Sequence, residues 1–134
     1  TGLVPATAAA KKEDLHTAVR YFGTAVLGRA TYTALSADRL DQARINSSKA
    51  EFLSETFMLP LDPAAVARCS VPTLLTVADS SPRIWPLLAQ CLHELMPNSQ
   101  IEQIPDASHI MHEDNKQHFN SVVGSFLKLQ EHID

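Results

Sequence analysis

One histidine stands where an α/β protein places a general base. Residues 101–114 begin with a short apolar segment that ends at Pro105, and a turn of small residues carrying His109 follows. An amphipathic helix is expected to start at about Asp114. A histidine just beyond a strand can hold its ring at the carboxyl edge of a sheet and accept a proton there. His109 is therefore the candidate general base.

The other histidines and acids near this turn do not predict a metal site. Their spacing fits no established zinc pattern, and such clusters near helix starts are usually solvated. The residues considered are His109, His112, Glu113 and His118. We expect no bound metal and no cofactor.

Composition and charge narrow the class of protein. The chain has 134 residues, about the length of one domain, and its net charge of -4 argues against a nucleic-acid partner. No apolar run approaches the ~20 residues of a membrane helix. Cys69 and Cys91 make no metal or redox motif, which favours reduced thiols in a cytoplasmic protein, with one disulfide as the alternative. Cys91 lies on the apolar face of a predicted helix, so we expect it to pack in the core.

The beginning of the sequence is interpreted as a cut or processed end. Residues 1–10 are small and mostly apolar, but Lys11 and Lys12 follow them, whereas a secretory signal carries its positive charge first. We expect residues 1–9 to be a linker or a frayed end.

The first half of the chain predicts helices. Gly28 is a plausible stop, Ser36 a plausible N-cap, and the run from Ser48 to Glu51 a capping box. Asp62 followed by Pro63 is typical of an N-cap with proline in the first turn. The expected helices span residues 10–27, 36–46, 48–58 and 62–68.

The second half predicts strand, helix, strand, helix. Residues 71–78 are apolar without alternation, which is typical of a strand buried on both faces of a parallel sheet. Ser81 and Pro82 are expected to cap a helix that ends near Pro97, and residues 99–104 form the second strand. A capped helix follows from Asp114. These elements form a right-handed crossover unit with two parallel strands.

Several motifs in this order resemble the C-terminal portion of α/β-hydrolase-fold enzymes. They are Val71-Pro-Thr-Leu-Leu, Ser81-Pro82, Leu95-Met-Pro-Asn and Ile104-Pro-Asp-Ala-Ser-His109. The resemblance is strong over residues 71–127 and weaker over the helices before them. It implies an α/β protein with a partial α/β-hydrolase fold, in which residues 1–68 form a helical cap and residues 69–134 form a β-α-β-α part of the core.

The resemblance also implies roles for individual residues. His109 falls on the family's catalytic histidine, which takes a proton from a serine. Ser81 stands at the usual position of the catalytic acid, so Asp79 is the nearest candidate, with an acid from an earlier strand as the alternative. Trp85 and Met111 flank loops that face the substrate pocket in that fold, so they are candidate substrate-binding residues; packing is the alternative for Trp85.

No nucleophile accompanies the histidine. The family's nucleophile elbow is G-x-S-x-G, and no pair among the four glycines has that spacing. The first hypothesis is therefore a fragment of a serine-type, esterase-like hydrolase, inactive alone, that acts on a small ester-like substrate once the missing N-terminal half completes it. The second is a truncated, non-catalytic relative that serves as a binding or assembly module. Two strands leave an open sheet edge, so we expect a partner: a second copy, as a dimer or domain swap, or the N-terminal half.

Overall fold

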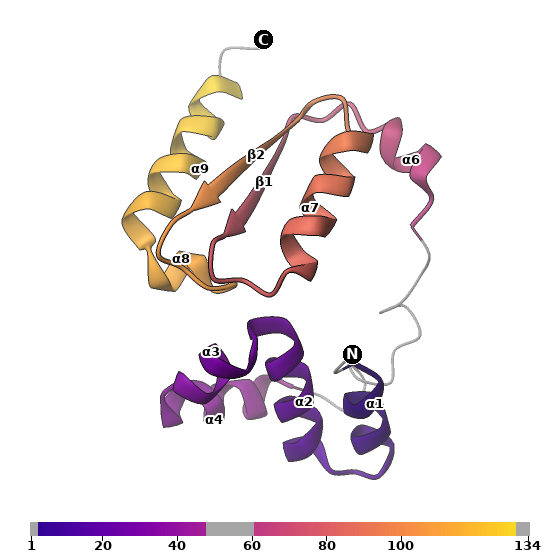
Figure 1. The fold of residues 1–134 in the computed structure, drawn as a ribbon, viewed down its shortest axis with the longest axis vertical. Coiled ribbons are helices and arrows are strands. Elements are labelled where there is room, and N and C mark those ends of the chain that lie inside the picture. Colours follow the sequence, from indigo (N-terminus) through magenta and orange to yellow (C-terminus); the bar gives the residue numbers. More distant parts are fainter. Residues whose placement is uncertain (1–2, 48–60, 131–134) are drawn as a thin grey trace. The chain divides into compact units, whose positions relative to one another are not determined.

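The computed structural model describes residues 3–47 and 61–130, and the chain divides into two compact units, Thr1–Pro60 and Leu61–Asp134. The described part of the first unit is helical, and the second unit contains a parallel sheet with helices beside it (Figure 1). The expected cap-like region ended at residue 68. In the structure the short helix Pro63–Ala67 belongs to the second unit.

The described part of the first unit is built from α1 (Leu3–Lys11), α2 (Leu15–Leu27), α3 (Arg29–Ala34) and α4 (Ala37–Asn46). The prediction of a loose segment at residues 1–9 is wrong for residues 3–9, which are helical. Alanine has the highest helix propensity, and this segment is rich in it. Helix α3 was not predicted either, because Gly28 ends α2 and a new helix starts at the next residue.

Small side chains let α1 and α2 approach closely. Ala9, Ala10 and Ala18 form a buried cluster between these two helices. A turn with Glu13 at φ 64° joins the helices, and the Asp14 carboxylate then accepts a hydrogen bond from the Thr17 amide at 3.0 Å. This bond is the main reason that the pKa of Asp14 lies below its usual value.

Two of the predicted caps are confirmed. The Ser36 hydroxyl accepts a hydrogen bond from the Arg39 amide at 3.3 Å at the start of α4, and the Asp62 carboxylate accepts one from the Ala64 amide at 3.0 Å at the start of α6 (Pro63–Ala67). The helix predicted at residues 48–58 lies outside the described residues.

The sheet of the second unit consists, within the described residues, of two parallel strands, β1 (Thr73–Ala78) and β2 (Ser99–Ile104). The sequence predicted both strands, with β1 two residues too long at its start. The register pairs Ala78 with Ile104, so both strands end at the same edge. The chain leaves that edge through two loops, and both candidate catalytic residues lie in them.

Helices α7 (Ile84–Leu95), α8 (Met111–Asp114) and α9 (Lys116–Gln130) complete the second unit. Two predicted caps are wrong. Helix α7 begins after Arg83 without a side-chain cap bond, not at Ser81 and Pro82. At α9 the capping side chain is Asn115, whose oxygen accepts the His118 amide at 3.2 Å, because Asp114 is engaged elsewhere.

The core of the second unit lies at the carboxyl ends of the strands. Its buried members are Ala78, Ile104, Ala107 and Met111, with Phe119 and Val122 of α9 packed against them. Residues 73–77 of β1 are only half-buried, so the expected burial on both faces is not reached within the described residues.

One face of α7 is apolar and exposed in the described structure. Ile84 is 51% exposed, Leu87 54% and Leu88 45%, while Ala89 is buried. Cys91 is also exposed, so the prediction that it packs in the core is wrong. Most of the apolar stripe that suggested core packing is therefore exposed in the described structure. None of the described helices is both long enough and apolar enough to cross a membrane.

Candidate active site

The two loops that follow the strands are hydrogen-bonded to each other. The Asp79 amide donates to the Ile104 carbonyl at 3.4 Å, and the Ser80 amide donates to the Ala107 carbonyl at 3.0 Å. These bonds extend the pairing of β1 and β2 past the end of the sheet. We call residues 105–110 the histidine loop. The hydrogen bonds described above join the start of the histidine loop to the loop after β1.

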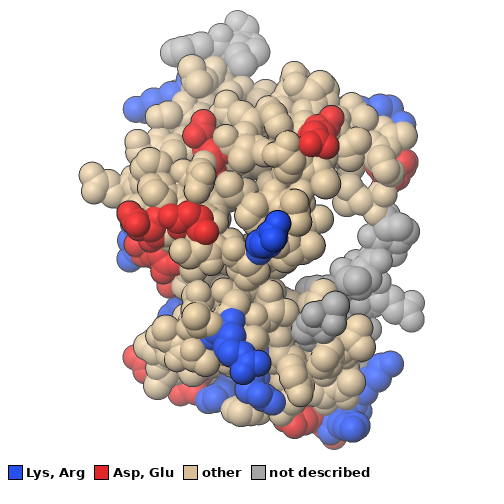
Figure 2. Space-filling view, in the orientation of Figure 1, with Lys and Arg blue, Asp and Glu red and all other residues tan. Residues whose placement is uncertain are grey.

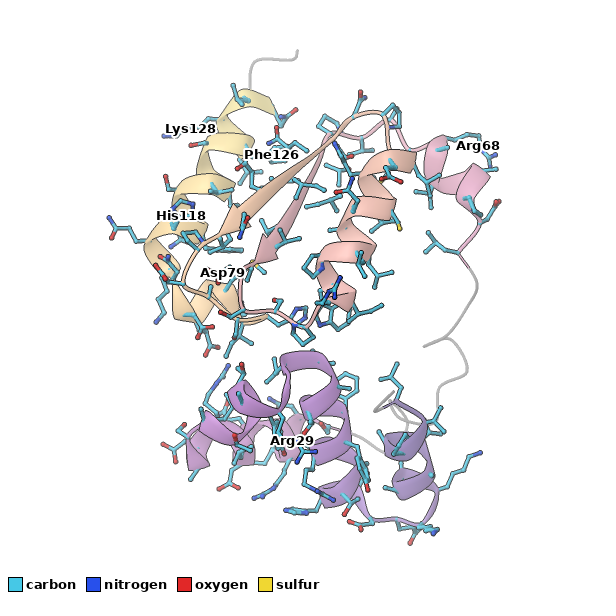
Figure 3. All side chains as sticks on the ribbon, viewed as in Figure 1. Arg29, Arg68, Asp79, His118, Phe126 and Lys128 are labelled. Carbon is cyan, nitrogen blue, oxygen red and sulfur yellow. The ribbon has the colours of Figure 1, made fainter. Side chains whose placement is uncertain are left out.

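Asp79 fastens the histidine loop through backbone hydrogen bonds. Its carboxylate accepts the Asp106 amide at 2.9 Å and the Ala107 amide at 3.2 Å, and the Ser80 hydroxyl donates to it at 3.3 Å. The two backbone bonds hold the pKa of Asp79 below its ordinary value because they favour the charged carboxylate. Asp106 has φ 52°, a left-handed conformation that few non-glycine residues adopt. Figure 3 labels Asp79, which lies beside the ends of the two strands.

A second carboxylate holds the middle of the histidine loop, at Ser108. Asp114 accepts the Ser108 amide at 2.8 Å and the Ser108 hydroxyl at 2.6 Å on the same oxygen. Ser108 is 7% exposed. The Asn115 side-chain amide donates to the Pro105 carbonyl at 2.9 Å. All of these anchors act on residues 105–108, so they fix the backbone directly before His109.

His109 is half-buried, and its ring stacks on Trp85. The ring centroids are 4.6 Å apart and the ring planes differ by 23°. Burial lowers the pKa of His109 below 6.5, because a buried imidazole loses hydration of its charged form. The imidazole is therefore mainly neutral near pH 7. A neutral ring held at the carboxyl edge of a sheet can accept a proton, which is what a general base requires.

The structure brings Asp79, Trp85 and His109 to one edge of the sheet, as the sequence suggested. Among the described residues, however, no hydrogen bond joins the Asp79 carboxylate to the His109 ring. Asp79 holds the backbone beside His109. The role of Asp79 as the triad acid stays a prediction.

The two candidate substrate-binding residues lie in different surroundings. Trp85 is half-buried and covers one face of the His109 ring. Met111 is 7% exposed and belongs to the core with Ala78 and Ile104. For Met111 the structure demonstrates packing, and its contact with substrate stays a prediction.

Ser81 has an unusual environment. Its hydroxyl oxygen is buried and has no hydrogen-bond partner among the described residues. A buried hydroxyl without a partner is costly. Residues 3–47 and 61–130 contain no group of three or more His, Cys, Asp or Glu side chains that could hold a metal ion.

Sequence reasoning missed the anchoring residues Ser108, Asp114 and Asn115. Asp114 was predicted to cap the last helix, and Ser108 was one of several small residues in a turn. A serine six residues before an aspartate has no recognised spacing rule, because the contact depends on the short helix α8 folding back toward the loop. The asparagine at position 115 did carry a signal, since Asn is a preferred N-cap residue.

No model of a protein family matches the sequence, and no curated protein matches it. Two solved structures are similar. MenH from S. aureus matches with a TM-score of 0.74 and 21% identity over 96% of this chain and 52% of MenH. CarC, a serine hydrolase involved in carbazole degradation, matches with a TM-score of 0.54 and 18% identity over 85% of this chain and 47% of CarC.

The chain therefore spans about half the length of the solved structures that it matches. Both are α/β-hydrolases, and the predicted resemblance to that fold is confirmed. A helical region followed by two parallel strands is consistent with the C-terminal portion of such a domain. This chain has a partial α/β-hydrolase fold.

Proposed function

We propose that this chain supplies the general base, His109, to a serine-type hydrolase whose nucleophile lies outside these 134 residues. The observation that carries the proposal is the pair of carboxylate anchors on the residues directly before His109. Asp79 holds the backbone before it, and Asp114 holds Ser108 directly before it. A base needs a fixed position relative to the group that it deprotonates, and anchored loops supply one.

The protonation state of His109 supports the same role. Its lowered pKa keeps the ring neutral at neutral pH, so it can take a proton from a hydroxyl and return it to a leaving group. Trp85 covers one face of the ring, which restricts how the imidazole can turn. The substrate class that follows is a small ester or related acyl compound.

The chain alone is proposed to be inactive. Its four glycines contain no G-x-S-x-G pair, and a base without a nucleophile beside it has nothing to activate. The test is turnover of p-nitrophenyl acetate by the purified chain, with His109→Ala as the matched control. We expect no difference between the two. Turnover that disappears in the variant would show that this chain carries its own nucleophile.

A second candidate function is assembly without catalysis, and one observation favours it. In the described part of the second unit, β1 pairs with β2 on one edge only, and Ile84, Leu87 and Leu88 form an exposed apolar face on α7. Open strand edges and apolar faces of this kind are where further protein packs. The proposed occupant is the nucleophile-bearing half of the fold or a second copy of this chain.

Size-exclusion chromatography with light scattering tests the expectation of a partner. Self-association that is abolished by Leu87→Lys on α7 would support a second copy. A stable monomer with a cooperative melt at micromolar concentrations would contradict self-assembly. The nucleophile-bearing half would then be the partner to test, by co-expression with this chain.

A further inference from the structure

A cavity of about 380 Å³ lies within the first unit, between α2 and α3. Its lining residues come from one face of each helix: Arg20, Tyr21, Thr24 and Ala25 of α2, and Arg29, Tyr32 and Thr33 of α3. Residues spaced by three or four positions share a helix face, so both sets face the space between the helices. The volume falls within the range of small-molecule pockets in proteins.

Two glycines shape the cavity. Gly28, at φ 84°, turns the chain sharply between α2 and α3 and lets them face each other. Gly23 provides the room for the Tyr32 ring, since a Cβ at position 23 would lie 2.5 Å from both Cδ2 and Cε2 of that ring. The Tyr32 ring therefore rests directly on the backbone of α2. The position of the Tyr32 ring in the cavity therefore requires glycine at position 23.

The charge of the lining is entirely positive. Arg20 and Arg29 contribute guanidinium groups, and no acidic residue lines the cavity. Neither guanidinium forms an ion pair or a hydrogen bond with a residue in the described part of the chain, although the charge of Arg20 contributes to the lowered pKa of Asp14. Arg44, by contrast, pairs with Asp41 at 2.7 Å. Basic side chains are prominent on the visible face of the first unit in Figure 2, and Figure 3 marks Arg29 at this face.

Aromatic groups accompany the charges. The Arg20 guanidinium carbon lies 4.9 Å from the centroid of the Tyr21 ring, and Tyr32 also lines the cavity. A guanidinium on an aromatic ring is held in place by a cation–π contact while its N–H groups stay available for an anion. Tyrosine rings offer flat apolar surface with a polar tip.

We propose that this cavity binds a small carboxylate with a flat apolar body. The carboxylate would accept paired hydrogen bonds from the Arg20 and Arg29 guanidinium groups, whose planar geometry matches it. The apolar body would pack against the rings of Tyr21 and Tyr32. This site is formed by the first unit alone, and the proposal does not depend on His109 or on hydrolysis.

The test uses benzoate as the probe and NMR signals of the full chain as the readout. Benzamide has the same shape without the charge, acetate has the charge without the ring, and inorganic phosphate is an unrelated anion. We expect saturable shifts of the Tyr21 and Tyr32 ring signals with benzoate, with a dissociation constant of about 1 mM for a fragment of this size. Benzamide, acetate and phosphate should each bind at least about tenfold more weakly, because each lacks one of the two recognised features.

Variants locate the binding site. Arg20→Gln and Arg29→Gln should each weaken benzoate about tenfold, the loss expected for a charged hydrogen-bond partner. Arg68→Gln, on the C-terminal side of α6 in the second unit, removes the same charge elsewhere and should leave benzoate binding unchanged. Tyr32→Leu keeps both arginines and should weaken benzoate while phosphate binding stays the same.

Each contrary outcome overturns a stated part of the proposal. Equal binding of benzamide and benzoate would refute recognition of the charge, and equal binding of phosphate or acetate would refute recognition of the ring. Benzoate binding that Arg68→Gln weakens as much as Arg29→Gln would refute the location. Absence of saturation well above 1 mM in the wild-type chain, with its NMR spectrum showing a folded protein, would refute the site as a whole.

Discussion

Replacing Ser108 with alanine should destabilise the second unit by a calculable amount. The Ser108 hydroxyl donates to the Asp114 carboxylate at 2.6 Å, and it accepts the Ile110 amide at a longer 3.4 Å. A hydrogen bond to a charged group contributes roughly 1.5–3 kcal/mol in a buried setting. Asp114 is exposed, so solvent screens the bond and we expect a loss of about 1 kcal/mol. For a unit of this size the melting temperature should fall by about 4–8 °C.

Urea titration followed by the fluorescence of Trp85, the one tryptophan in the sequence, measures this loss. Trp85 stacks on His109, one residue after Ser108, so its emission also reports any shift of the histidine loop. The matched control is Ser70→Ala, which removes an exposed hydroxyl that makes no hydrogen bond with a described residue. If the two variants differ by less than about 0.5 kcal/mol in free energy of unfolding, the anchor does not stabilise the loop as argued.

Three further predictions follow from the same structure. Asp79→Ala should speed hydrogen exchange at the Asp106 amide, and unchanged protection would mean that the carboxylate does not fasten the loop. Gly23→Ala should lower the melting temperature, because the added Cβ would lie 2.5 Å from the Tyr32 ring. Gly124→Ala, whose Cβ would have no atom within 4 Å, should raise the free energy of unfolding by up to about 1 kcal/mol. Equal effects of the two substitutions would refute the close packing of Tyr32 on Gly23. Burial lowers the pKa of His109 in the folded state, so the unfolded chain binds more protons and the free energy of unfolding should fall as pH drops below 6.5. In urea titrations at several pH values, His109→Gln should make the free energy of unfolding depend less on pH. An unchanged pH dependence in this variant would contradict the prediction.

The sheet of the second unit was predictable because its signals are local. The apolar run at residues 71–78 located β1, the segment between Asn98 and Pro105 located β2, and the helix between them fixed their parallel order. The burial of β1 and the packing of Cys91 were not predictable in the same way. An apolar stripe predicts that a helix face packs against other protein, but it does not show whether the packing partner belongs to the described residues.

The candidate site was predictable in its residue types and only partly in its contacts. The turn after the second strand marked His109, and parallel topology brought Asp79 to the same edge. The sequence could not show that Asp79 bonds to backbone amides, because that contact depends on how two loops 27 residues apart meet. It also could not show that Ser108 and Asp114 bond to each other, since that contact depends on the short helix α8 folding back toward the loop.

His109 is proposed to serve as a base for a nucleophile supplied elsewhere in the fold. The most direct measurement joins this chain to the G-x-S-x-G-bearing half of a known α/β-hydrolase and follows p-nitrophenyl acetate turnover against pH. We predict turnover in the joined protein that His109→Ala removes, and that declines as pH falls through a pKa below 6.5, where the imidazole takes up its proton. A folded, active joined protein whose turnover is the same with alanine at position 109 would contradict the role of His109 as the base.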